Sequence, residues 1–393
     1  MIPFQRSTHA SRPAGSRRSC GSSIARRSRA ALGLLLPAFA AACSGAETAT
    51  EHTGAFVIGL GAVPGKPGYD NVVRGVELAV ERLNETGQIR FRVRLPAKDA
   101  SSAVSVAQAL QRDASVIGVV GHPQSGQSLE ALPVYVDGAN DGANAVVMVS
   151  PTASSPRLTG ISPWFFRLAP SDDAAARFVA RWTLDSLGAR RAAVIYRNDS
   201  YGRDWSSTFA TAFKAGAGII VARDPYLPGI TEWEAYAGML ARLRPDVLLF
   251  PGDAGDAVEL LRALEAEGVK LAFVGGDGTG AMAAAPEAQG ARYVAFFSPD
   301  RATSAEGESF LNRYRARFRE DPDMFAALSY DAALAIGKSV VGGARTRSAV
   351  RDAIERLGNG TPAIDGAGGS IAFGQNHDAA GRTVAVTMIG DVP

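Results

Sequence analysis

Short apolar runs rich in β-branched residues, each followed by a stretch of helical periodicity, constrain the fold of this chain most strongly. Such runs end in Gly, Ser, Pro or Asp, and they lie at residues 55–61, 115–121, 145–151, 192–196, 246–252 and 271–276. Strands that alternate with helices form parallel sheets whose two faces are both covered. The sequence therefore predicts an α/β fold.

The segments between these runs support that prediction. Apolar side chains recur every three or four residues over 72–83 and over 104–110, which is typical of helices that cover a sheet. Ligands of open parallel sheets bind beyond the carboxyl ends of the strands, where helix N-termini point outward. Candidate binding residues are therefore expected where the strands end.

The first 42 residues have the composition of a bacterial export signal. They hold seven arginines and no acidic residue, and they end in an apolar run, 30–42, directly before Cys43. The small residues before Cys43 resemble the lipobox of bacterial lipoproteins, although Ala40 stands where leucine is usual. We expect a signal peptide at 1–42, followed by a lipidated Cys43 and a flexible spacer that together span 43–54. Cleavage nearby with a free thiol and an uncleaved anchor are the alternatives.

Removal of this leader changes the charge balance of the chain. Residues 43–393 carry 34 basic and 39 acidic side chains, so the slight positive excess of the whole chain comes from the leader. This balance does not suit a nucleic-acid partner. About 350 residues exceed the usual size of a single core, so we expect two domains and no later membrane-spanning segment.

Motifs of common enzymes and nucleotide-binding proteins are not met. The glycine-rich stretch 59–68 fits neither a phosphate-binding loop, because Pro67 follows Lys66, nor the dinucleotide fingerprint, because residue 64 is proline. Ser125 lacks the flanking glycines of a nucleophile elbow, and the histidines lack metal-ligand spacing. We therefore expect no catalytic residue, cofactor or metal.

Seven sequence blocks are similar, in order, to those of a known family. They include VSPTASSPRLTG and AAVIYRNDSYGRDW, and they lie at 121–128, 149–160, 165–172, 192–205, 273–278, 328–337 and 368–382. Together they resemble the branched-chain amino-acid-binding (Leu/Ile/Val-binding protein-like) family of periplasmic proteins, which are type I solute-binding receptors of ABC importers. The resemblance runs over nearly all of residues 55–390.

The resemblance implies the type I periplasmic-binding-protein fold, in which two doubly wound parallel-sheet lobes are joined by three crossover segments and close on a ligand. The crossings are expected near 168–170, 297–299 and 361–364. Lobe 1 would then consist of 55–168 plus 299–361, and lobe 2 of 169–298 plus 362–393.

In the first lobe, the resemblance assigns ligand-binding roles to Ser125 and to the loop residues Thr152, Ala153 and Ser154. Ser125 stands where the family has a serine that binds the α-carboxylate, and the loop would grip both the carboxylate and the ammonium of an amino acid. A plain helix cap for Ser125 and a turn stabilised by Ser and Pro for the loop are the alternatives.

In the second lobe, Asp277 occupies the place of the family acid that pairs with the α-ammonium. Tyr201 matches an aromatic residue that covers the ligand. An Asx-turn for Asp277 and a packing role for Tyr201 are the alternatives. Asp253 stands where relatives often have an aromatic residue. As a second carboxylate beside Asp277, it would favour a ligand with a further cationic or donor group, unless it is an exposed aspartate at the rim.

The resemblance implies a lipid-anchored substrate-binding protein of an ABC importer, located in the cell envelope on the outer face of a membrane or in a periplasm. It would bind an amino acid or a similar small carboxylate-bearing metabolite without changing it, and it would dock on an ABC permease. The alternative is a non-transport envelope lipoprotein of the same fold that binds or activates a protein partner such as a cell-wall synthase.

Overall fold

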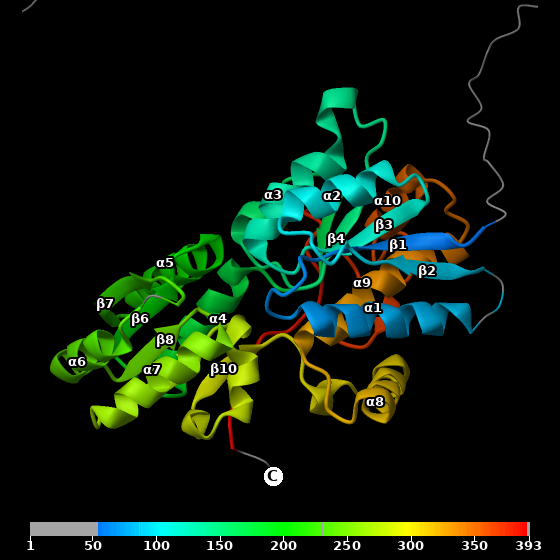
Figure 1. Cartoon of the computed structure of the whole chain (residues 1–393). Helices are drawn as coiled ribbons and strands as arrows, with labels where there is room; N and C mark the ends of the chain where they lie inside the picture. Colours follow the sequence, from blue (N-terminus) through cyan, green and yellow to red (C-terminus); the bar gives the residue numbers. More distant parts are fainter. Residues whose placement is uncertain (1–53, 86, 88, 230, 391–393) are drawn as a thin grey trace, which may run out of the picture. The chain divides into compact units, whose positions relative to one another are not determined.

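The apolar runs of the sequence form inner strands of two sheets (Figure 1). The computed structural model describes residues 54–390 apart from 86, 88 and 230. The predicted signal peptide, Cys43 and all but the last residue of the spacer lie outside the described residues. Within the described part of the chain, strands alternate with helices as predicted, and the α/β fold with parallel sheets is confirmed.

The first sheet has five parallel strands. Their order is β2 (Phe91–Arg94), β1 (Phe56–Gly61), β3 (Val116–Gly121), β4 (Met148–Ser150) and β5 (Phe165–Arg167). Its helices are α1 (Tyr69–Asn84), α2 (Ala103–Arg112), α3 (Ser125–Val136), α8 (Ala305–Phe318), α9 (Met324–Val341) and α10 (Arg347–Glu355). Helices α1 and α9 pack on one face of the sheet, and α2 and α3 pack on the other. The helical periodicity in the sequence predicted α1 and α2 correctly.

The second sheet has six strands. Their order is β13 (Ala385–Met388), β10 (Arg292–Ala295), β9 (Ala272–Gly275), β8 (Val247–Phe250), β6 (Arg191–Arg197) and β7 (Ile219–Tyr226). Only β13 runs antiparallel to its neighbour in this sheet. Its helices are α4 (Asp172–Asp185), α5 (Ser200–Ala215), α6 (Trp233–Leu243) and α7 (Ala254–Ala266), together with the short helix η3 (Asp277–Ala284).

Strand β6 shows why its sequence is apolar on both faces. Ala192 and Val194 pack in the core that contains α4 and α5, whereas Ala193 and Ile195 pack in the core that contains α6 and α7. Successive side chains of a strand point to opposite faces. A strand covered on both faces therefore has no position for a solvent-facing polar residue, which explains the continuous apolar runs.

Three segments connect elements of the two sheets. One runs from β5 to α4, a second from β10 to α8, and a third precedes β13. Before β13, the chain forms a hairpin of β11 (Ile364–Gly366) and β12 (Gly369–Ile371), which contacts α8 and α9. Asp378 then pairs with Arg167 at the end of β5. The expected lobe boundaries remain a prediction.

Helix α9 is the core helix of the first sheet. By length and composition alone, it is long and apolar enough to span a membrane, and it is the one such helix within the described residues. No segment of this kind was expected from the sequence. Most of its residues are buried against α1 and the strands β1, β3 and β4. Its composition is therefore accounted for by its central place in the fold.

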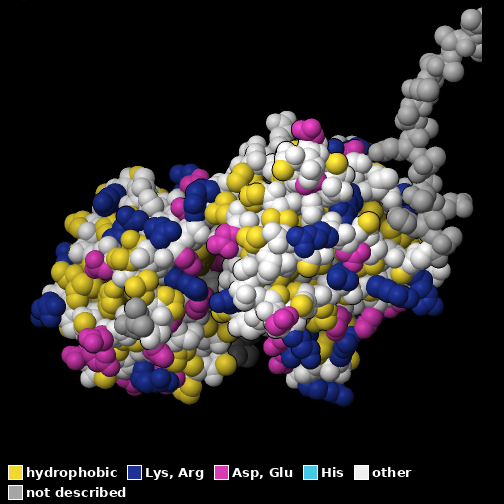
Figure 2. Space-filling view, turned by 45° about the horizontal axis from the view of Figure 1, so that its top comes forward, with side chains coloured by type: hydrophobic (Ala, Val, Ile, Leu, Met, Phe, Trp, Pro, Cys, Tyr) yellow, Lys and Arg dark blue, Asp and Glu magenta, His cyan; other side chains and the backbone are white. Residues whose placement is uncertain are grey.

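The surface carries charges of both signs. On the face seen in Figure 2, acidic and basic side chains are interspersed, and neither kind gathers into one broad patch. This distribution agrees with the near balance of charge in residues 43–393.

Candidate functional site

Ser125 is the first residue of α3 and lies directly beyond the end of β3. Its hydroxyl oxygen accepts hydrogen bonds from the backbone N–H groups of Ser154, at 3.2 Å, and Ser155, at 3.1 Å. Gln124, and not Ser125, is the N-cap residue of α3, so Ser125 is not the plain helix cap considered above. Its own O–H group remains available to donate to an anion at this helix end.

The loop after β4 lies against the start of α3 through a set of buried polar contacts. Thr152 donates from its hydroxyl to the carbonyl of Pro123 at 2.7 Å, and the amide of Ala153 donates to the hydroxyl of Ser150 at 3.1 Å. Thr152, Ala153 and Ser154 are all buried. The structure therefore brings Ser125 and the predicted loop together, with the Thr152 hydroxyl engaged in holding the loop.

Tyr201 and Asp277 meet at the carboxyl edge of the second sheet. Tyr201, in the first turn of α5, donates from its hydroxyl to Asp277 Oδ1 at 2.8 Å. Asp277 begins η3 after β9 and is only 6% exposed. Burial raises the pKa of Asp277 to about 6. Tyr201 and Asp277, two of the three residues predicted from this lobe, therefore form one hydrogen-bonded pair.

Asp172 is a third buried group of this site, and sequence reasoning missed it. It is the first residue of α4, it is 0% exposed, and its amide donates to the carbonyl of Ser154 at 2.7 Å. Neither of its carboxylate oxygens has a hydrogen-bond partner among the residues that the structure describes. An acidic residue in the first turn is common in helices. In the sequence, Asp172 therefore cannot be distinguished from an ordinary acidic residue at the start of a helix.

Asp172 and Asp277 influence each other electrostatically. Burial raises the pKa of Asp172 well above its ordinary value, and the nearby carboxylate of Asp277 raises it further, while the Ser154 side chain and Arg167 partly offset the rise. Two acids that share a buried space resist ionising together. A cation or a donor group placed near both would stabilise their negative charge.

Helix α5 also contacts the loop after β4. Ser155 donates to Asp204 Oδ2 at 2.5 Å, and Arg157 forms an ion pair with the same carboxylate oxygen at 3.1 Å. These bonds join a residue of α5 to the loop that holds Ser154. The candidate residues at the ends of the first sheet's strands thus lie close to those at the ends of the second sheet's strands.

Asp253 differs from Asp172 and Asp277 because it forms an ion pair with an arginine. It pairs with Arg197, which also forms an ion pair with Asp199 at 3.0 Å. Asp253 precedes α7 and keeps about a third of its side chain exposed, at 30%. Arg197 therefore offsets the charge that Asp253 would otherwise present to a ligand.

The arrangement offers a hydroxyl at a helix N-terminus and two buried carboxylates. Such a set suits a molecule that carries an anionic group and a cationic group. Within the described residues, no three His, Cys, Asp or Glu side chains are grouped so as to hold a metal ion.

This combination of fold and site defines a class: two-sheet α/β proteins that bind a small molecule. The periplasmic binding protein family model matches residues 64–391, so the chain belongs to that family. Its members are binding proteins and not enzymes, and the family implies a place outside the cytoplasm.

One curated relative is the Leu/Ile/Val-binding protein BraC3 of Rhizobium johnstonii. It is 27% identical over 216 residues, which is 53% of this chain and 57% of the relative. The chain thus matches little more than half the length of that protein.

Solved structures match over more of the chain. The branched-chain amino acid transporter substrate-binding protein LivJ of Streptococcus pneumoniae, in complex with isoleucine, has a TM-score of 0.76 at 23% identity, covering 85% of this chain and 96% of that protein. An ABC transporter substrate-binding protein of Desulfitobacterium hafniense, in complex with Leu, has a TM-score of 0.72 at 26% identity, covering 86% of this chain and 98% of that protein. The type I periplasmic-binding-protein fold is therefore confirmed.

Proposed function

We propose that this protein binds an amino acid, or a similar small molecule with both an amine and a carboxylate, at the site of Ser125, Asp172 and Asp277. The unpartnered, fully buried carboxylate of Asp172 beside Asp277 is the observation that carries the proposal. Buried charges are ordinarily paired. An ammonium group between these acids would supply the missing partner.

Each part of the site has a role in this proposal. The hydroxyl of Ser125 and the N-terminus of α3 receive the ligand's carboxylate. Asp172 and Asp277 receive its ammonium, and Tyr201 orients Asp277 through their hydrogen bond. The relatives named for leucine, isoleucine or valine binding, and the solved complexes with leucine and isoleucine, support this ligand class.

The burial of these groups requires motion during binding. Ser125, Asp172 and Asp277 are each less than 7% exposed. A ligand reaches them only if α5 and the loop after β4 separate, which breaks the bonds of Asp204 to Ser155 and Arg157. Ligand binding would then favour the closed state, in which α5 and the loop after β4 come together around the ligand.

Calorimetric titration of matched pairs of compounds tests the proposal. The pairs are leucine with 4-methylpentanoate and phenylalanine with 3-phenylpropanoate, since each pair differs only in the amine. We expect binding of at least one amino acid and at least about tenfold weaker binding of its amine-free partner, since a hydrogen bond to a charged group contributes about 1.5–3 kcal/mol. Equal binding of both members would contradict a role for the acids in holding an amine.

The finer proposal is that the protein serves an ABC importer from a lipid anchor at Cys43. The leader and its lipobox-like end support the anchor, and the family supports the importer. Metabolic labelling with radioactive palmitate should mark the protein and not its Cys43→Ser variant. Absence of label in the unchanged protein would contradict the anchor. Silence of a broad amino-acid panel in ligand-free protein would instead favour an envelope lipoprotein that binds a protein partner.

A further inference from the structure

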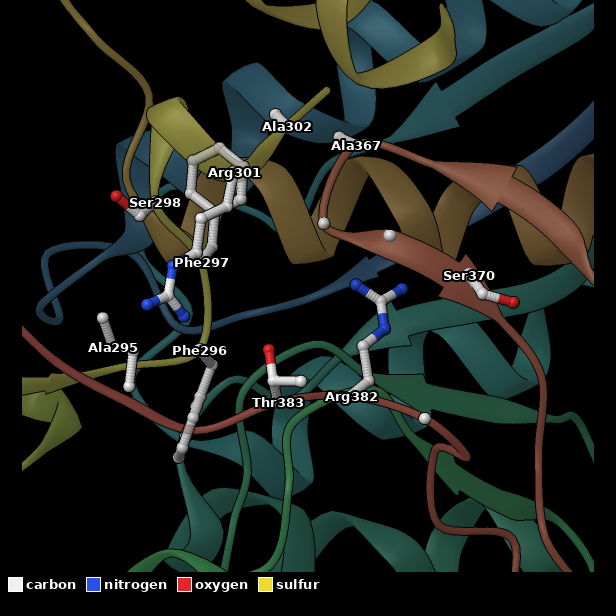
Figure 3. Close-up of a pocket in the computed structure, with 14 residues that line it drawn as sticks. Ala295, Phe296, Phe297, Ser298, Arg301, Ala302, Ala367, Ser370, Arg382 and Thr383 are labelled. Atoms are coloured by element: carbon white, nitrogen blue, oxygen red, sulfur yellow. The ribbon is translucent and has the colours of Figure 1, made fainter. Parts of the chain in front are cut away.

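A cavity of about 190 Å³ lies apart from the amino-acid site, where three segments of chain meet (Figure 3). Its walls come from residues 295–302 after β10, residues 367–370 at the turn of the β11–β12 hairpin, and residues 381–385 leading into β13. None of the candidate ligand-binding residues lines it. The first and third of these segments connect elements of the two sheets.

Arg382 is the most unusual residue of this cavity. Its side chain is 3% exposed, and its Nη2 group donates to Asp331 Oδ2 at 2.7 Å. Its Nε and Nη1 groups are buried, and neither has a hydrogen-bond partner among the residues described by the structure. Leaving buried donors of a charged group unpaired is costly. Arg382 therefore lines the cavity with two unused donors in its guanidinium fork, and both donors lie beneath the surface of the wall.

Asp331 does not accept hydrogen bonds from the two unpaired donors of Arg382. Besides Arg382, it accepts the amides of Ala367, at 2.6 Å on Oδ1, and Gly368, at 3.0 Å on Oδ2. A Cβ atom at Gly368 would lie only 2.4 Å from Arg382 Nη1, so the backbone passes tightly against the guanidinium. Asp331 thus accepts hydrogen bonds from three groups, and only one of them, Nη2, belongs to Arg382.

A second guanidinium lines the same cavity. The side chain of Arg301 is exposed, and it has no ion pair or hydrogen bond among the described residues. Figure 3 shows the guanidinium groups of Arg301 and Arg382 and the hydroxyl of Thr383 around the pocket. No carboxylate lines it. The nearby acids are Asp331 and Asp300, and Asp300 accepts a hydrogen bond from Ser298.

We propose that this cavity binds a small oxyanion, of the class of phosphate, sulfate or a short carboxylate, between Arg382 and Arg301. The planar fork of an arginine matches two oxygens of such an anion. A small movement of Arg382 or of the backbone at Gly368 would bring the free donors of Arg382 to the anion. The anion would also neutralise Arg301 and accept from Thr383. This site is independent of the proposed amino-acid site, and it would link two of the segments that connect the sheets.

Isothermal titration of the purified protein with sodium phosphate, sodium sulfate and sodium acetate, at constant pH and ionic strength set by sodium chloride, tests the proposal. We expect saturable binding of at least one oxyanion. Phosphate or sulfate binding would indicate an inorganic occupant, and acetate binding would indicate an organic carboxylate. Arg382→Lys keeps a cation for Asp331 but removes the fork, so the affinity should fall at least about tenfold.

Three further variants distinguish this site from other effects of salts. Arg301→Gln should weaken binding several-fold, whereas Arg181→Gln, an exposed arginine on α4, should leave it unchanged. Ser125→Ala should also leave it unchanged, because Ser125 belongs to the amino-acid site. The absence of saturable binding would overturn the proposal. So would binding that survives Arg382→Lys and Arg301→Gln in folded protein, or binding that Ser125→Ala abolishes.

Discussion

Asp331 and Asp172 are both fully buried, but they differ in whether the protein supplies hydrogen-bond partners for the carboxylate. Asp331 on α9 accepts bonds from Ala367, Gly368 and Arg382. Asp172 on α4 accepts none from the described residues. Burial raises the pKa of both. Arg382 and the two amides partly offset the rise at Asp331, and the Ser154 side chain and Arg167 partly offset it at Asp172. The first is thus built into the structure, and the second is left free for a ligand.

The largest expected effect is on stability at the paired aspartate. Asp331→Ala should lower the free energy of unfolding by about 3–5 kcal/mol, because it leaves Arg382 buried without its partner. Denaturant titration followed by circular dichroism measures this change. A loss below about 1 kcal/mol would show that the pair is dispensable and would remove the contrast.

At the unpaired aspartate and its neighbour, the expected effect is on ligand affinity. Asp172→Asn and Asp277→Asn should each weaken an amine-bearing ligand by about 10- to 100-fold, which corresponds to the 1.5–3 kcal/mol of a charged hydrogen bond. Asp172→Asn should leave stability unchanged or raise it by about 1 kcal/mol, since it removes a buried ionisable group. Calorimetric titration and denaturation measure the two quantities. Asp185→Asn, exposed on the same helix, is the matched control.

The pH dependence of stability should also reflect Asp277, the neighbour of the unpaired Asp172. Because the pKa of Asp277 is raised from 3.8 to about 6, the folded state binds a proton more tightly than the unfolded chain between these values. Stability should therefore fall as pH rises from about 4 to 6, by up to about 3 kcal/mol from this group. Denaturation at several pH values should show a smaller fall in Asp277→Asn. An identical pH profile in the variant would contradict the assignment.

The smallest predicted effect concerns Ser125, which combines a structural and a binding role. Ser125→Ala leaves the amides of Ser154 and Ser155 without their acceptor, so stability should fall by about 1–2 kcal/mol and affinity should fall with it. Ser125→Thr, which retains the hydroxyl, is the control for both measurements. If Ser125→Ala lowers affinity but leaves the free energy of unfolding unchanged, the hydrogen bonds from Ser154 and Ser155 do not stabilise the fold.

The sequence allowed correct prediction of the six inner strands β1, β3, β4, β6, β8 and β9, because both faces of each sheet are covered. Ala192 to Ile195 must all be apolar, and this leaves a continuous run that is readable without a structure. Ser125 and Asp277 could be placed because each follows such a strand.

Contacts between distant segments could not be predicted in this way. Arg197 and Asp253 are 56 residues apart, and nothing local in the sequence links them. Asp172 looks like an ordinary acid in the first turn of a helix, and only its burial without a partner distinguishes it. The pairing of Asp331 with Arg382 likewise depends on α9 and the segment before β13 coming together.

The most direct test of the account is a ¹³C NMR titration of the aspartate carboxyl groups in ligand-free protein, repeated in the presence of excess leucine. The account predicts that Asp277 titrates near pH 6 and that Asp172 titrates well above the ordinary range when the site is empty. It also predicts that an amine-bearing ligand lowers both values, because an ammonium group stabilises the charged carboxylates. Ordinary titration of both acids near pH 4 in the empty site, or values unchanged by a bound amino acid, would contradict it.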